Sequence, residues 1–193
     1  GYFESKRLLF PRFFFISDTL LLELLGDGSE PQKIMGHISM LFDSLAKVEF
    51  DENDSMKMLA MIADDGEYVK LSAPLECGGL AEEYLEKLVG AMRATIHDIS
   101  RECAQDVIAW ESHLMEHLFQ GFCCQVSLIG LQLYWTFQAE EALSKAKQDK
   151  LIMNNTAKKF DSDLKELTSL VNNQLGPSER ILLESMITLQ MYQ

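Results

Sequence analysis

The chain has 193 residues, 47% of them hydrophobic and 9% aromatic, so it is long enough to bury a core and too apolar to be disordered. Its 30 acidic and 17 basic residues give a net charge of −13, which disfavours nucleic acid and anionic membrane surfaces as partners. No apolar run approaches the roughly 20 residues that a membrane-spanning helix needs.

The first notable segment, residues 6–18, opens with a Lys-Arg pair and continues as Phe-Pro-Arg-Phe. Because proline stops a helix and holds the preceding residue extended, Pro11 predicts a break after an extended Phe10. The four phenylalanines between positions 10 and 15 require a large apolar surface. The Arg12 guanidinium should stack on a ring or pair with a buried carboxylate. By composition alone, the segment is typical of an aromatic core crossing.

Two helices are predicted next. Ser17 or Asp18 should cap a helix that ends at the glycines of residues 26–28. Capping-box spacing and a proline in the first turn predict a second helix from about residue 30 to 45. Its apolar positions share one face, as expected of a surface helix: Ile34, Ile38, Leu41, Phe42 and Leu45.

In residues 46–72 the helical spacing gives way to alternating and short apolar stretches separated by acidic turns, which predict a small antiparallel β meander. Its three strands are expected at residues 47–50, 58–63 and 68–71, joined by acidic turns at 51–54 and 64–67. These turns lack the EF-hand spacing, so we interpret them as solvated turns and not as calcium loops.

Residues 74–79 form a connector and the expected boundary between residues 1–75 and 76–193. Beyond it, helical spacing predicts a long helix over residues 85–110 and then three more helices. These are expected at residues 122–146, 160–175 and 177–192, with a break at Asn154 and Asn155. The helix at 122–146 is apolar almost all round and should be the most buried. The fold class is therefore mainly α: an elongated helical bundle with a small antiparallel β meander inserted near residues 46–72.

One pattern suggests an enzyme. His113, Glu116 and His117 have the His-x-x-Glu-His form of inverted zinc peptidases, with both histidines on one helix face and the glutamate as base. Catalytic zinc needs a third protein ligand, for which Glu140 and Glu141 are the candidates. Two exposed histidines beside a helix end explain so short a pattern more simply, so we expect no metal site.

Nucleotide and thiol chemistry are not predicted. The chain has no G-x-x-x-x-G-K-[ST] loop to hold phosphates. The adjacent Cys123 and Cys124 are poor zinc ligands and poor disulfide partners. With Cys77 and Cys103 they are irregularly spaced, which indicates a reducing, intracellular compartment. The start at Gly1, without an initiator methionine or signal peptide, indicates a piece excised from a longer chain.

The order of three segments resembles the linker of dynein heavy chains. The Lys-Arg, Phe-Pro-Arg-Phe and Ser pattern of residues 6–18 and the leucine-rich helix of residues 20–26 are similar to one part of that linker. Gln125-Val126, Gln132 to Thr136 with Trp135, and Ala142-Leu143 resemble a later part. Residues 164–192 look like the helical pair that precedes the first AAA+ module.

Two departures from the family pattern stand out. Phe122-Cys123 replaces an aromatic-proline pair, and the closing histidine and Arg-Asp are absent where the chain has Tyr192 and Gln193.

The resemblance implies a non-catalytic, mechanical segment that transmits ATP-driven changes of an AAA+ ring during microtubule-based movement. Its partners would be the AAA+ ring of the same heavy chain and, through the parent motor, the microtubule. ATP and Mg²⁺ would belong to the parent, with no cofactor in this segment. The location would be cytoskeletal, in the axoneme of a cilium or flagellum, with the cytoplasm as the alternative.

The structural or interaction candidates come from the two best-matching segments: Phe10, Pro11, Arg12, Phe13, Phe15, Gln132 and Trp135. Trp135 is either plain core or a docking residue, and its apolar neighbours favour core. Two other classes remain in competition with the motor segment, a stand-alone helical interaction module and a zinc hydrolase.

Overall fold

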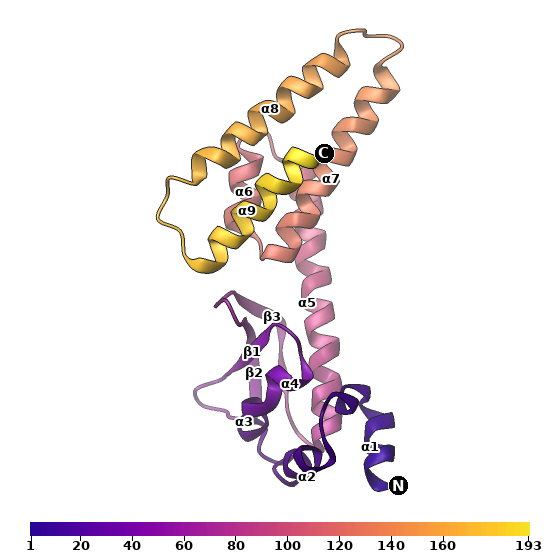
Figure 1. Ribbon diagram of the computed structural model, residues 1–193, viewed down its shortest axis with the longest axis vertical. Coiled ribbons are helices and arrows are strands. Elements are labelled where there is room, and N and C mark those ends of the chain that lie inside the picture. The colour runs from indigo at the N-terminus through magenta and orange to yellow at the C-terminus, as the bar shows by residue number, and fades with distance from the viewer. The chain divides into compact units, whose positions relative to one another are not determined.

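The computed structural model describes residues 1–193 and groups them into two compact units, residues 1–96 and 97–193 (Figure 1). The division falls inside helix α5 (Ala81–Ala109) and not at the expected boundary after residue 75. The physical reason is that the first turns of α5 belong to the first core, where Tyr84, Leu85 and Leu88 are fully buried. Each unit is described separately below.

The first unit begins with α1 (Tyr2–Leu9), the 3-10 helix η1 (Pro11–Phe15) and α2 (Asp18–Gly26). Phe10 is extended between the first two elements, with φ −133° and ψ 95°, as the following proline predicts. The Ser17 hydroxyl accepts a hydrogen bond from the Leu20 N–H at 3.3 Å, so the predicted cap of α2 is confirmed.

The single helix predicted over residues 30–45 is wrong. The chain forms α3 (Pro31–Ile34), a 3-10 turn η2 (Met35–His37) and α4 (Ile38–Leu41). The breaks coincide with Gly36, because glycine has a low helix propensity, and with Phe42, whose backbone is already extended. The predicted apolar face is nevertheless buried in full, because short helical turns keep the same residues on the core side.

The β meander is confirmed. Strands β1 (Leu45–Phe50), β2 (Lys57–Ala63) and β3 (Tyr68–Glu76) form an antiparallel sheet in the order β1-β2-β3. Val48 pairs with Met61, which in turn pairs with Val69. β3 runs through Pro74, so the start of the expected connector is strand. β3 is an edge strand, and Pro74 lies where its pairing with β2 is irregular, between Lys70 and Leu75, which is a position where sheets tolerate proline.

The acidic turns between the strands are held by their own side chains. The Asp51 and Asp54 carboxylates accept hydrogen bonds from the Asn53 and Met56 N–H groups, at 2.8 and 3.0 Å. Asp65 does the same in the second turn, accepting from the backbone of Glu67. These local bonds are typical of Asx turns and account for the aspartates without a bound cation.

The second unit contains the end of α5, α6 (Leu114–Gly121), α7 (Cys124–Lys145), α8 (Ile152–Leu170) and α9 (Pro177–Tyr192). α6 was not predicted, because it has only two turns and follows a break in the spacing. The break placed at Asn154 and Asn155 is wrong, since both lie in the first turn of α8. The last helix begins at Pro177 as predicted.

One face of α7 forms the centre of the second unit. Its buried side includes Val126, Ser127, Gly130, Leu131 and Tyr134, whereas Phe137 is 42% exposed. Apolar residues all round the helix therefore do not mean burial all round. No helix of the chain combines the length and apolar character needed to cross a membrane. The mainly α class with a small antiparallel meander is confirmed.

Candidate functional site

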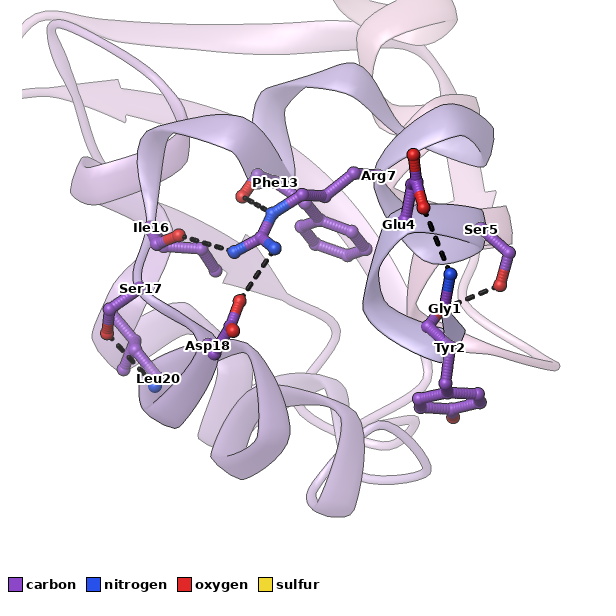
Figure 2. Close-up of polar contacts among 10 residues, drawn as sticks. All are labelled: Gly1, Tyr2, Glu4, Ser5, Arg7, Phe13, Ile16, Ser17, Asp18 and Leu20. Atoms are coloured by element: carbon purple, nitrogen blue, oxygen red, sulfur yellow. Dashed lines mark hydrogen bonds and ion pairs between the residues drawn. The ribbon is translucent and has the colours of Figure 1, made fainter.

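Arg7 joins the first three elements of the chain. Its Nε donates to the Phe13 carbonyl at 3.2 Å, and its Nη2 donates to the Ile16 carbonyl at 3.0 Å. Nη1 forms an ion pair with Asp18 at 2.6 Å. Figure 2 shows the guanidinium between η1 and the start of α2, with all three contacts directed to it. A planar guanidinium with several fixed donors suits this arrangement, and lysine could not replace it.

Lys6 forms an ion pair with Glu82 at the start of α5. Glu82 is only 4% exposed, and its second carboxylate oxygen has no hydrogen-bond partner in the protein. The hydrogen bond to Glu82 raises the pKa of Lys6, so the ammonium stays charged. A buried carboxylate held by one cation makes α1 strongly dependent on α5 within this unit.

Arg12 stacks on a ring, which was one of its two predicted environments. Its Cζ lies 4.5 Å from the centroid of Phe42, and its Nη1 donates to the Leu41 carbonyl at 2.9 Å. Leu41 is the last residue of α4, where carbonyls lack helical partners. Arg12 therefore caps α4 and pairs with no carboxylate.

The aromatic run divides into two buried and two exposed rings. Phe10 and Phe13 are 1% and 0% exposed and meet edge to face at 4.9 Å. Phe14 and Phe15 are 60% and 73% exposed, so the expectation that all four rings enter an apolar surface is wrong. In the 3-10 helix that Pro11 starts, side chains three residues apart share a side, so Phe10 and Phe13 enter the core together and Phe14 and Phe15 do not.

The two candidates on α7 lie in different environments. Gln132 is exposed and lines a shallow open groove between α7 and α9, with Leu128, Ile181 and Thr188. Trp135 is partly buried and stacks on Phe160 of α8 at 6.2 Å. Its indole N–H is buried and has no partner in the protein. Trp135 thus packs between α7 and α8.

Tyr134 and Asp163 add a polar tie between the same helices. The Tyr134 hydroxyl donates to the Asp163 carboxylate at 2.7 Å, and Lys159 lies 5.2 Å from the tyrosine ring centroid. Burial is the main cause that raises the pKa of both Tyr134 and Asp163. The residues after Gln132 therefore fix α7 to α8 through one stacked pair and one hydrogen bond.

The histidines of the His-x-x-Glu-His pattern do not share a helix face. His113 precedes α6 with φ 55° and is exposed. His117, in contrast, forms a hydrogen bond between its Nε2 and the Asp106 carboxylate at 2.7 Å. The His117 ring also stacks on Trp110 at 3.6 Å. The zinc pattern's shared helix face is wrong, because the helix starts one residue later than that pattern requires. Of the two exposed histidines expected beside a helix end, His113 lies there and is exposed, whereas His117 lies within α6 and is partly buried. No group of three or more metal-ligating side chains is found.

Sequence reasoning passed over Lys6 and Arg7 as site residues, although it noted the pair. The signal was present: two adjacent basic residues before an aromatic run need anions or carbonyls nearby. Their partners, Glu82 and the carbonyls of η1, could not be identified without the tertiary structure.

The contacts at residues 6–18 and on α7 all join one element of the chain to another. The fold and these contacts define a helix-rich segment in which cations and stacked rings hold short elements in fixed positions. Residues 1–103 match the family described as Dynein heavy chain, N-terminal region 2. The chain belongs to this family.

Individual relatives agree with the family match. The chain is 36% identical over 193 residues to dynein axonemal heavy chain 5 of Rattus norvegicus and 37% identical to dynein axonemal heavy chain 8 of Mus musculus. It is also 37% identical to the dynein gamma chain of the flagellar outer arm of Chlamydomonas reinhardtii. All of the chain is covered each time, but only 6%, 4% and 4% of these relatives.

Proposed function

We propose that this chain is a mechanical linker segment of a dynein heavy chain. In this role it transmits ATP-driven conformational change of an AAA+ ring during microtubule-based movement. The observation that carries the proposal is the family match, together with the alignment of all 193 residues of this chain to an axonemal heavy chain. The architecture supports it, because force transmission needs closely packed elements that resist deformation.

The segment itself is proposed to be non-catalytic and to bind no cofactor, with ATP and Mg²⁺ acting in the parent motor. Its direct partner would be the AAA+ ring of the same heavy chain, and the microtubule would be reached through the parent. The names of the relatives, axonemal, ciliary and flagellar, support a place in the axoneme of a cilium or flagellum.

The test separates force transmission from ATP hydrolysis in the parent heavy chain. Arg7→Met removes the guanidinium that ties α1, η1 and α2 together, so we expect microtubule gliding to slow several-fold. The microtubule-stimulated ATPase rate should change less than twofold. Lys47→Met, at an exposed position of β1, is the matched control and should leave both rates unchanged.

Two results would contradict the proposal. Thermal unfolding first establishes that Arg7→Met is destabilised. If microtubule gliding by this variant is nevertheless normal, the segment carries no strain. A reading frame without a G-x-x-x-x-G-K-[ST] motif downstream of Gln193 would favour the alternative, a stand-alone helical interaction module.

A further inference from the structure

The connection between α7 and α8 is basic in an otherwise acidic chain. Residues 145–159 contain five lysines and one aspartate, an excess of four positive charges where the whole chain carries −13. Within the second unit this connection lies past the end of α9 (Figure 1). We call residues 143–159, which include the first two turns of α8, the α7–α8 tip.

Two of the five lysines have partners within the chain. Lys145 pairs with Glu141 one turn earlier, and Lys159 donates to Gln138 at 2.9 Å. The other three, Lys147, Lys150 and Lys158, are exposed and form no ion pair or side-chain hydrogen bond. Lys150 also lies just before the N-terminus of α8, where positive charge disfavours the helix. Helix stability therefore does not explain this lysine.

Exposed apolar side chains lie among these lysines. Leu143 and Leu151 are each 64% exposed, and Met153 is 48% exposed. Each of the three lies within two helical turns of the connection, which is about 10 Å along the axis of α7 or α8. A surface that combines unpaired lysines with exposed leucine and methionine suits a ligand that is both anionic and apolar.

We propose that the α7–α8 tip is a docking surface for a separate protein segment that is acidic and carries apolar side chains, such as an amphipathic acidic helix. Charge complementarity identifies the partner class. A bilayer or a nucleic acid is an extended polyanion and would also face the acidic remainder of the chain, whereas a short acidic helix would meet only the tip. Charges farther away than about 10 Å are screened at physiological salt. This inference does not depend on the proposed mechanical role.

The test uses the full 193-residue chain and a fluorescein-labelled 21-residue peptide of glutamate and leucine, arranged as an amphipathic helix. In fluorescence anisotropy we expect saturable binding that weakens with added salt. K147E/K150E/K158E should weaken binding at least tenfold. L151S/M153S should weaken it severalfold and leave the salt dependence in place.

The matched control is K47E/K70E/K87E, which reverses three exposed lysines of the first unit and changes the net charge equally. It should bind the peptide within twofold of the unmodified chain. Circular dichroism checks folding, and K147Q/K150Q/K158Q replaces the charge-reversed variant if that variant does not fold. Equal loss in both triple variants would overturn the proposal. So would tighter binding to phosphatidylserine vesicles or to a 20-nucleotide RNA than to the peptide.

Discussion

Arg12 lies over the ring of Phe42, with its Cζ 4.5 Å from the ring centroid, and donates to the carbonyl of the neighbouring Leu41. We expect Arg12→Ala to lower the free energy of unfolding by about 1–2 kcal/mol, through lost stacking and one lost hydrogen bond. The free energy of unfolding of Arg12→Lys should lie between those of the unmodified chain and Arg12→Ala, because lysine keeps the charge but not the flat guanidinium. Urea unfolding measures both. A change below about 0.5 kcal/mol for Arg12→Ala would show that these contacts do not stabilise the fold.

Arg7→Met should lower the free energy of unfolding by about 2–3 kcal/mol, because two partly buried carbonyls and a carboxylate lose their donor together. The matched control is Asp18→Asn, which weakens only the ion pair. Asp18 is 65% exposed, so this change should cost about 1 kcal/mol or less. Equal costs for the two variants would contradict the central role of the guanidinium.

Lys6→Met should be among the most damaging substitutions, at about 3–5 kcal/mol, because it leaves the buried Glu82 carboxylate without its cation. Adding Glu82→Leu should recover most of the loss. Lys33 makes an exposed pair with Glu30, so Lys33→Met should leave the free energy of unfolding nearly unchanged. Failure of the double variant to recover stability in chemical unfolding would mean that Lys6 acts by packing alone.

Gly130→Ala should destabilise by about 1–3 kcal/mol. A Cβ at Gly130 would lie 2.5 Å from the Cys103 sulfur and 2.8 Å from Leu118 Cδ2, so α7 must move away from its neighbours. Gly90, in α5, has open space around the same position, and Gly90→Ala should stabilise by about 0.5–1 kcal/mol. Thermal unfolding of the pair checks both signs. A neutral Gly130→Ala would show that this contact is loose.

Stability should fall between about pH 9 and pH 11. Burial raises the pKa of the Cys77 and Cys103 thiols from 9.0 to about 11. Above pH 9 these thiols ionise in the unfolded chain but stay protonated in the folded one, so the folded state binds more protons and loses relative stability. The expected loss is on the order of 1–2 kcal/mol for each thiol.

The pH effect has a direct control. C77A/C103A should show a much shallower fall in urea midpoint between pH 8.5 and pH 10.5 than the unmodified chain. An identical slope in both proteins would assign the effect to other groups.

The local signals in the sequence were strong where single residues control the backbone. Pro11 ended α1, Ser17 capped α2, Pro177 began α9, and alternation with acidic turns gave the meander. The prediction failed where helices are short or interrupted, as at residues 31–41 and in α6. There a few residues of helical spacing do not distinguish one helix from two turns, and neighbouring elements decide.

The candidate residues show the same division. The Phe-Pro-Arg-Phe segment was recognisable from the sequence. The exposure of Phe15 and the importance of Arg7 were not, because both depend on where the turn after Pro11 directs each side chain.

By itself, the sequence determined the mainly α class, the meander, the helix-ending residues and the likeness to dynein linkers, since these depend on residues close together in the chain. Tertiary structure decided which cation meets which partner. Lys6 meets Glu82 across 76 positions and Arg12 meets Leu41 across 29, and local spacing carries no information about contacts so distant in the sequence.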